Sequence, residues 1–508
     1  MELNTHICSQ LIEKTKAFAQ ITLDDDYIVR DNKPDVLRVI YSQGDILLED
    51  TKVGSQGVWI TGKLRFHTLY QSDDENRRLD SVSGEIPFQE KLVVDELEEG
   101  DEVSVAVQIE DLSVGIINSR KLVIRAVLNM SAKNLEEMDA EIACAVPAEY
   151  KYEQKTTTLP MLSLVANKKD MIRMQKEMLL PNSRTNIREI IFSNVEFRNE
   201  EIQLQDERAQ VQMDAQVVVL YRSESTGEYE CYETVVPLSG TVDLPRVRGD
   251  EIFWAKVTPV ETMVEPRGDY DGEARMIGLE MTLAVELLVW QEEMSEILLD
   301  AYSLEKELHL TRESLELNQL LVKNLSKVRI LEQVQLEPNQ ERILQICGCS
   351  GKIILDRTQK KENGIQIEGF LTVHILYNTT EDSMPYAHSS SQIPFEQFIE
   401  IEGLTEDSAV WIDERIEQLQ VNLLDNTEYE VKAVLQIGVL AFSSMPIDNI
   451  VSVEEEPLDI ETLQKQPGMI GCVRRAGEDL WDIAKKYHAT ADNIIEIGEK
   501  VLVVKQIK

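Results

Sequence analysis

The sequence is poor in basic residues. Lys and Arg number 51 among 508 residues, whereas Asp and Glu number 92, so the formal net charge is −41. A protein that binds nucleic acid gains affinity by neutralising phosphates with Lys and Arg, and an anionic membrane surface attracts the same cationic side chains. The charge therefore argues against both targets and predicts a solvated acidic exterior.

Long apolar runs are also missing. No stretch approaches the roughly 20 apolar residues that a transmembrane helix requires. The N-terminal sequence MELNTHICSQLIEKTKAFAQITLDDD contains neither a basic segment nor an apolar one, so we expect no signal peptide. The six cysteines form no C-x-x-C pair, and reduced thiols are the default in the cytosol. We therefore expect a cytoplasmic protein.

Motifs for catalysis and for metal or nucleotide binding are absent too. The segment CGCSGK ends like a phosphate-binding loop, but that loop needs Gly and Ser or Thr where this chain has Ile346 and Ile353. No G-x-S-x-G motif is present, no Cys and His have a recognisable catalytic spacing, and the six histidines are dispersed. We expect no catalytic residue, no metal site and no cofactor, and hence a protein that is not an enzyme.

A threefold repeat is the strongest feature that is present. Three alternating apolar segments end in Leu-Tyr, and each is followed by a polar turn and then a proline after Ile or Val. The tyrosines are Tyr70, Tyr221 and Tyr377, and the prolines are Pro87, Pro237 and Pro394. The Tyr-to-Pro spacing is 17, 16 and 17 residues, and the Tyr-to-Tyr period is 151 and then 156. A period this long indicates tandem domains, in which we expect these residues to be equivalent.

Two histidines share one position of this repeat. His67 and His374 both stand three residues before the repeat tyrosine, where the second repeat has Val218. A position that accepts Val is a poor candidate for a catalytic or metal-binding side chain. We expect both histidines on a strand surface.

The apolar pattern within each repeat has a period of two, as in KLRFHTLY and MTLAVELLVW, with turn-forming residues between the segments. Several short strands separated by turns are typical of a β-sandwich or barrel. Helix is expected only in short connecting pieces, for example around ESLELNQLLVKNL. The predicted fold class is mainly β, with three tandem sandwich-like or barrel-like repeat domains.

The repeat spacing and the segments that lead into each repeat also predict domain boundaries. We place the β repeats, with their lead-in segments, at residues 1–138, 139–299 and 300–445. A stretch rich in Pro, Asp and Glu follows and predicts an acidic linker at residues 446–467. Residues 468–508 then form a separate small module.

One short amphipathic helix is predicted in this C-terminal module. In GEDLWDIAKKYHAT, the apolar residues at helical spacing are Leu480, Ile483, Ala484 and Tyr487. Asp479 can cap the first turn, with Asp482 as the acid of a capping box. Thr490 is expected to cap a second short helix, and strand-like segments stand on either side, so the predicted order is βααβ.

A second stripe of this helix is polar and aromatic. Trp481, Lys485 and His488 lie one residue further round than the apolar face. Two interpretations are open for Trp481, which either covers the small core or anchors a partner at an exposed position. In the second case Lys485 would steer an acidic patch of the partner.

The module resembles a LysM domain. The family pattern contains a Gly, a polar pair, Leu-x-x-Ile-Ala and a Tyr, and the matching residues here are Gly477, Leu480, Ile483, Ala484 and Tyr487. Arg474 replaces the usual Val of the first strand, and the loop that borders the glycan groove in the family is shortened to EIGEKV. These departures put glycan binding in doubt.

Three β repeats followed by a LysM domain resemble the SipL-like family of clostridial spore coat morphogenetic proteins, which have three SPOCS domains. The resemblance implies a scaffold in the mother-cell cytoplasm, at the forespore surface, that binds stage IV sporulation protein A, the ATPase of the coat basement layer. Other coat proteins are further candidate partners. The alternative is a peptidoglycan-binding protein that uses the LysM domain for wall glycan.

The candidate partner-binding residues all lie in the module. They are Gly477, Asp479, Leu480, Trp481, Lys485 and His488. From Gln466 onward the chain has seven Lys or Arg against six Asp or Glu, so the module carries a charge of +1 and the rest of the chain −42. A nearly neutral module can approach partners that the acidic repeats would repel.

Overall fold

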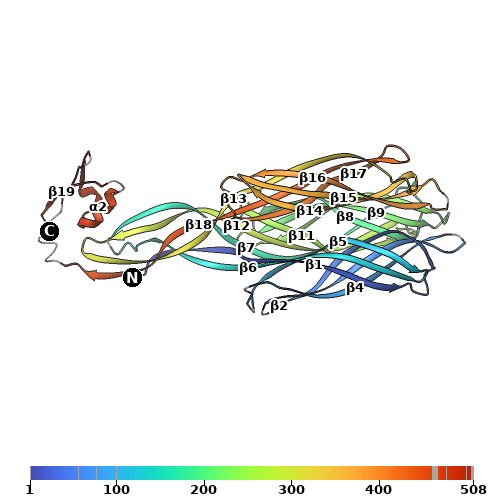
Figure 1. Cartoon of the computed structure of the whole chain (residues 1–508), viewed down its shortest axis with the longest axis horizontal. Helices are drawn as coiled ribbons and strands as arrows, with labels where there is room; N and C mark the ends of the chain where they lie inside the picture. Colours follow the sequence, from blue (N-terminus) through green and yellow to red (C-terminus); the bar gives the residue numbers. More distant parts are fainter. Residues whose placement is uncertain are drawn as a thin grey trace.

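The alternating segments of each repeat form six β-strands in the computed structural model (Figure 1). The first repeat contains β1 (Asn4–Ile28), β2 (Val36–Gly54), β3 (Gly57–Ser72), β4 (Leu79–Leu92), β5 (Val103–Asn118) and β6 (Lys121–Ala145). The second contains β7 (Glu153–Leu179), β8 (Ile187–Gln205), β9 (Arg208–Ser223), β10 (Tyr229–Asp243), β11 (Ile252–Arg267) and β12 (Met276–Tyr302). The third contains β13 (Lys306–Gln335), β14 (Ile343–Lys361), β15 (Gly364–Thr379), β16 (Tyr386–Glu400), β17 (Ala409–Leu423) and β18 (Glu428–Pro457).

The structure describes residues 2–54, 56–75, 77–95, 97–98, 100–150, 152–381, 383–459, 467–475, 478–498 and 500–504. Within these ranges no helix has the length and apolar character needed to span a membrane.

Each repeat is a sandwich of two three-stranded antiparallel sheets. One sheet is a meander of the second, third and fourth strands, and the other joins the first, sixth and fifth strands. The inner faces of both sheets share one apolar cluster in each repeat. Its members include Ile60 and Leu128 in the first repeat, Val217 and Leu283 in the second, and Val373 and Leu435 in the third. Alternation with a period of two lets each sheet bury one face in this way, and the predicted mainly-β class is confirmed.

The repeat tyrosines and prolines are equivalent, as predicted. Each tyrosine ring is fully buried, and its hydroxyl donates to the carbonyl oxygen 36 residues upstream. Each proline pairs with the residue seven positions before the tyrosine of its own repeat. These pairs are Pro87 with Lys63, Pro237 with Asp214, and Pro394 with Phe370. The three repeats therefore share one fold in one register.

The first and last strands of each repeat are longer than the sequence pattern suggested. They remain paired to the ends Asn4–Ala145, Glu153–Tyr302 and Lys306–Pro457. The expected boundaries at residues 138, 299 and 445 consequently fall inside β6, β12 and β18. Residues 446–457 of the expected acidic linker are strand, with Ile450 and Val453 buried, because β13 offers them a partner along their whole length. Residues 460–466 of that linker lie outside the described residues.

The helix expected around ESLELNQLLVKNL is wrong. Residues 313–325 lie within β13 and pair with β18. Leu317 is buried among side chains of the other two repeats. An apolar segment of this kind fits either secondary structure locally, and here the neighbouring strand decides.

The long strand pairs pack together into a stem that extends beyond the sandwiches (Figure 1). We define the stem as the paired residues 4–13 with 135–145, 153–164 with 290–302, and 306–320 with 442–457. Its apolar clusters draw on all three repeats, as Cys8, Met161 and Leu317 illustrate. The stem thus joins the repeats into one body.

Buried amide side chains link the strand edges inside the stem. Gln10 is 1% exposed, donates to the Leu162 carbonyl at 2.9 Å and accepts from the Asn318 backbone amide at 2.7 Å. Asn449 accepts from the Ala143 backbone amide at 3.0 Å and donates to the Glu141 carbonyl at 2.8 Å. These side chains satisfy backbone groups that the strand ladders leave open.

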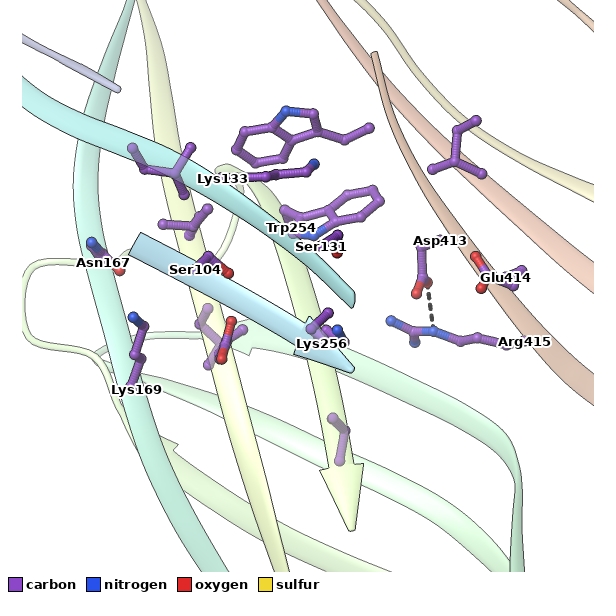
Figure 2. Close-up of a pocket in the computed structure, with 18 of the residues that line it drawn as sticks. Ser104, Ser131, Lys133, Asn167, Lys169, Trp254, Lys256, Asp413, Glu414 and Arg415 are labelled. Atoms are coloured by element: carbon purple, nitrogen blue, oxygen red, sulfur yellow. Dashed lines mark ion pairs between the residues drawn. The ribbon is translucent and has the colours of Figure 1, made fainter. Parts of the chain in front are cut away.

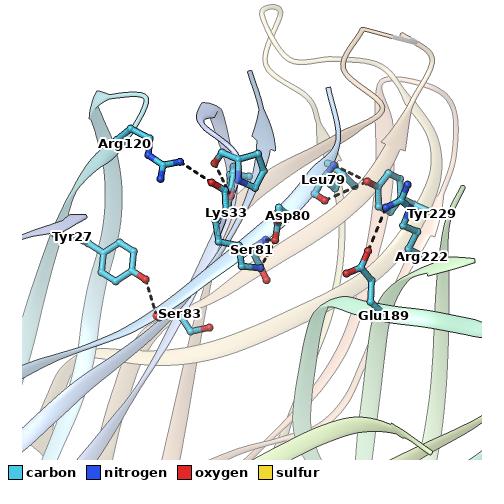
Figure 3. Close-up of polar contacts among 12 residues, drawn as sticks. Tyr27, Lys33, Leu79, Asp80, Ser81, Ser83, Arg120, Glu189, Arg222 and Tyr229 are labelled. Atoms are coloured by element: carbon cyan, nitrogen blue, oxygen red, sulfur yellow. Dashed lines mark hydrogen bonds and ion pairs between the residues drawn. The ribbon is translucent and has the colours of Figure 1, made fainter. Parts of the chain in front are cut away.

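Equivalent residues of the three sandwiches also meet at a central cluster. It contains the leucine that precedes each repeat tyrosine, namely Leu69, Leu220 and Leu376. Around it, the Tyr229 hydroxyl accepts from the Leu79 amide at 3.0 Å, and the Tyr386 hydroxyl donates to the Tyr229 carbonyl at 3.2 Å. Figure 3 shows Tyr229 reaching the Leu79 backbone from the neighbouring repeat. The repeats are therefore arranged with pseudo-threefold symmetry.

The C-terminal module lies at the free end of the stem, near the N-terminus (Figure 1). It contains β19 (Met469–Val473), α2 (Leu480–Tyr487), a 3-10 turn η1 (Ala491–Asn493), β20 (Ile494–Ile497) and β21 (Lys500–Val504). The expected second helix is wrong, because only the turn η1 is helical and Ile494 begins a strand that pairs with β21. Alternation explains the strand, since Ile494 packs on the core and Ile495 is exposed.

Candidate functional site: the docked face of the C-terminal module

A capping box fixes the start of α2. The Asp479 side chain accepts from the Asp482 amide at 2.8 Å, and the Asp482 side chain accepts from the Asp479 amide at 3.0 Å. His488 ends the helix in the left-handed conformation with φ 49°. These caps stabilise a helix of eight residues that would be too short to be stable alone.

The apolar face of α2 forms the core of the module, as predicted. Ile483 and Ala484 are buried, and Leu480 and Tyr487 pack on the same core with residues of β19 and β21. Leu480, which we expected among the partner-binding residues, is therefore an internal packing residue. Gly477, another expected site residue, lies outside the described residues.

The second stripe of α2 faces the stem. The Asp300 carboxylate, near the end of β12, accepts from Trp481 Nε1 at 2.7 Å and holds Lys485 Nζ at 2.7 and 2.9 Å from its two oxygens. Asp300 is only 16% exposed and also lies 3.4 Å from Arg312 of β13. One carboxylate thus binds both residues that the sequence singled out as anchor and steering charge.

Further contacts surround this carboxylate. The Tyr302 ring meets Trp481 edge to face, with centroids 4.8 Å apart, and its hydroxyl donates to the Ala489 carbonyl at 2.8 Å. His488 Nδ1 lies 3.2 Å from the Ser303 carbonyl oxygen, which accepts when Nδ1 carries the proton. Lys155 Nζ lies 2.5 Å from Asp479 Oδ2.

The contact between the module and the stem has two sides. The docking face is Asp479, Trp481, Lys485 and His488, and the stem tip is Lys155, Asp300, Tyr302 and Ser303. Four of the six expected partner-binding residues therefore lie together on one face. No sequence pattern indicated the stem-tip residues, because they lie in parts of the chain far from the module.

The ion pair between Asp479 and Lys155 stabilises the charged form of both side chains. The hydrogen bond to Lys155, followed by that to the Asp482 amide, lowers the pKa of Asp479. The hydrogen bond to Asp479 raises the pKa of Lys155. Burial raises the pKa of Tyr302 to about 12, so its hydroxyl stays protonated and can donate.

No apolar cluster of the described residues crosses the contact. The module core consists of module residues, including Ile483 and Val503, and the cluster beneath the stem tip consists of stem residues, including Leu298 and Ile450. Ion pairs at partly exposed positions contribute roughly 0–1 kcal/mol each. The module is consequently held by polar contacts and one ring pair, unlike the repeats, which share apolar clusters.

A second feature is a cavity of about 370 Å³ between the three repeats. Figure 2 shows Lys133, Trp254 and Lys256 beside Asp413, Glu414 and Arg415. Arg415 pairs with Asp413 at 2.6 Å and with Glu200 at 2.8 Å. Burial raises the pKa of Glu200 and of Glu414 to about 7. Arg415 thus forms ion pairs within this group, and its pair with Glu200 joins the third repeat to the second.

The repeat histidines are covered by neighbouring repeats. His67 stacks on Phe192 of the second repeat with centroids 4.7 Å apart, and the His374 ring lies 5.9 Å, centroid to centroid, from Tyr41 of the first repeat. Within its own repeat, His374 Nδ1 lies 3.1 Å from His388 Nε2. The strand surfaces on which we expected them are thus interfaces between repeats. In the described part of the chain, no group of three or more His, Cys, Asp or Glu side chains is placed to hold a metal ion.

Comparison with known families bears on the repeats. Residues 35–117 and 342–424 match a family model described as SipL, SPOCS domain. The chain is similar to the SipL-like sporulation family. The matched segments comprise β2–β5 and β14–β17, and together they cover less than half of the chain. No curated protein and no solved structure matches it.

The match has a structural counterpart in the second repeat. Strands β8–β11 have the same order, the same pairing and the same buried tyrosine as the two matched segments. The similarity to the SipL-like family indicates a role related to sporulation.

Proposed function

We propose that this protein is a non-enzymatic sporulation scaffold. In this proposal it tethers stage IV sporulation protein A, the coat ATPase, to the forespore surface from the mother-cell cytoplasm. The observation that carries the proposal is the pair of SPOCS matches within a body of three equivalent repeats that ends in a small module. The second repeat acts as a third SPOCS domain and the module as a LysM domain.

The architecture of the repeats supports a scaffold. The central cluster and the stem join all three repeats through buried side chains, so the body acts as a rigid spacer. Partly buried charged groups also connect the repeats, as Arg415 of the third repeat does with Glu200 of the second. A rigid body with a separate module at its end suits a protein that holds one partner at a set distance from another.

The character of the module supports binding to a protein rather than to wall glycan. Its charge of +1, against −42 for the rest of the chain, allows contact with acidic partners. The docking face combines Trp481 with Lys485, and Trp is enriched where binding energy concentrates in protein interfaces. The loop that borders the glycan groove of LysM domains is short here.

Co-purification from sporulating cells tests the proposal. We expect the coat ATPase to purify with the full chain and to be lost when the chain ends at Pro467. Retention of the ATPase by the shortened chain would contradict the role of the module. In parallel, we expect purified sacculi not to retain the full chain, whereas retention would favour the alternative of peptidoglycan binding.

A further inference from the structure

The stem tip occupies the surface that is suited to a partner. Every member of the docking face has a stem contact, and Trp481 and Lys485 share the single carboxylate of Asp300. While the module is docked, the stem holds the hydrogen-bonding positions of these groups, so a partner has to displace the stem to bind them. The contact is therefore a template for the chemistry that the docking face recognises.

The stem offers three kinds of group to the docking face. A carboxylate bridges Trp481 Nε1 and Lys485 Nζ, and an aromatic ring lies edge to face on the Trp481 indole. A carbonyl oxygen lies within reach of His488. A charged hydrogen bond combined with an aromatic pair is directional, so it selects for an acidic residue close to an aromatic one.

We propose that the docking face is the partner-binding surface and that the stem tip is an internal mimic of the partner. The partner presents an acidic residue beside an aromatic one and displaces Asp300 and Tyr302. This inference rests on the proposed function, in which the module binds the coat ATPase, and adds the residues and the regulation of that contact.

Release of the module leaves the buried Asp300 carboxylate paired. Asp300 keeps Arg312 of β13, which also donates to the Leu299 carbonyl at 2.7 Å. The Lys155 and Asp479 side chains are 39% and 43% exposed in the docked state, so water reaches them readily on release. Because no apolar cluster of the described residues crosses the contact, a partner that supplies the same polar groups can exchange with the stem tip.

Substitutions on the two sides of the contact have opposite expected effects. Asp300→Ala removes the mimic, and we expect the full chain to bind the purified coat ATPase about tenfold more tightly if the open state is about a tenth populated in the wild-type chain. Trp481→Ala and Lys485→Ala remove the recognising groups, and we expect each to weaken binding at least about tenfold. Glu292→Ala is the matched control, because Glu292 is exposed on the same strand, eight residues before Asp300.

Hydrogen exchange of the full chain without partner gives an independent readout. We expect faster exchange in residues 478–493 for Asp300→Ala and no change for Glu292→Ala. Unchanged exchange in Asp300→Ala overturns the inference. So does binding of the ATPase that is no tighter for Asp300→Ala, or undiminished for Trp481→Ala. Absence of binding by every variant and by the wild-type chain overturns the proposed function, and exchange then decides alone whether the stem tip covers the docking face.

Discussion

The repeat tyrosines occupy the same position in all three repeats and make the same hydrogen bond there. Each hydroxyl reaches a backbone carbonyl just before the second strand of its own repeat, as Tyr377 does to Glu341 at 3.0 Å. Burial raises the pKa of Tyr221 and of Tyr377 to about 12, so both hydroxyls remain donors at neutral pH. The sequence revealed these residues because the strand that carries each tyrosine and the turn that follows are local.

Removal of one such hydroxyl should show how much its hydrogen bond contributes to the free energy of unfolding. Tyr377→Phe leaves the Glu341 carbonyl without its donor in a partly buried setting, and we expect a loss of about 1 kcal/mol in the free energy of unfolding. Denaturant unfolding measures it. Tyr270→Phe is the control, because Tyr270 is fully exposed. Equal stabilities of the Tyr377→Phe and wild-type chains would show that the bond does not stabilise the fold.

The histidine pair should make stability depend on pH. Burial lowers the pKa of His388 to about 3 and, with a smaller effect of Lys352, lowers that of His374. Below the unfolded value of about 6.5, the unfolded chain binds protons that the folded chain refuses, so stability falls as pH falls. For His388 alone we expect a slope of up to about 1.4 kcal/mol per pH unit between about pH 6 and 4.

A difference measurement isolates this histidine from opposing groups. Glu200 and Glu414 have folded pKa values of about 7, above their unfolded values, so their contribution instead grows as pH falls from 7 towards 4.5. The pH profile of His388→Gln minus that of the wild-type chain removes their effect. We expect the variant to lose less stability on acidification, whereas His309→Gln, at an exposed position, should follow the wild type. Parallel profiles for His388→Gln and wild type would contradict the assignment.

At the scale of elements, the stem strands depend on side chains that imitate strand pairing. Asn449 connects β18 to the Ala143 amide and the Glu141 carbonyl of β6. Gln10 connects β1 to β7 and β13 in the same manner. A sequence pattern cannot indicate such links, because an amide residue in an alternating segment equally well faces water.

Asn449→Ala should therefore destabilise the stem. It leaves a buried backbone amide without its acceptor and a partly buried carbonyl without its donor, and an unpaired buried polar group costs roughly 1–3 kcal/mol. We expect at least about 2 kcal/mol of lost stability in denaturant unfolding. Asn426→Ala, in the exposed turn before β18, is the matched control. A loss no greater than that of the control would mean that water replaces the amide.

The elements predicted correctly and incorrectly differ in what determines them. Strands were predictable because alternation is a property of neighbouring residues, and the α2 start was predictable because Asp479 and Asp482 form a local capping box. The lengths of β6, β12 and β18 were not, since a partner strand more than 100 residues away sustains them. The helix expected after Thr490 failed because pairing with the adjacent strand β21 takes Ile494 and Ile495 into a strand.

At the scale of the whole molecule, two kinds of contact hold the parts together. The repeats share apolar clusters, whereas the module is docked through ion pairs, hydrogen bonds and one ring pair. Apolar burial is insensitive to moderate salt, while partly exposed charge pairs are screened over about 10 Å at 0.1 M and about 3 Å at 1 M. The two kinds of contact should respond differently to ionic strength.

High salt should release the module without loosening the body. We expect small-angle X-ray scattering of the full chain to show a larger maximum dimension at 1 M sodium chloride than at low salt. Asp300→Ala should show the larger dimension already at low salt, and Glu292→Ala should behave as wild type. A maximum dimension that is independent of salt and of Asp300 would show that other contacts hold the module.

The sequence by itself determined the β class, the threefold repeat, the equivalent tyrosines and prolines, the helix cap, and the grouping of Trp481, Lys485 and His488 on one helix face. All of these depend on spacing within a short segment or on a repeated pattern, so local rules are sufficient to predict them. Only the tertiary structure decided where the strands end, how the repeats meet, and what covers the docking face. Asp300 and Trp481 are 181 residues apart, and their contact follows from where the stem ends in space, which no local pattern encodes.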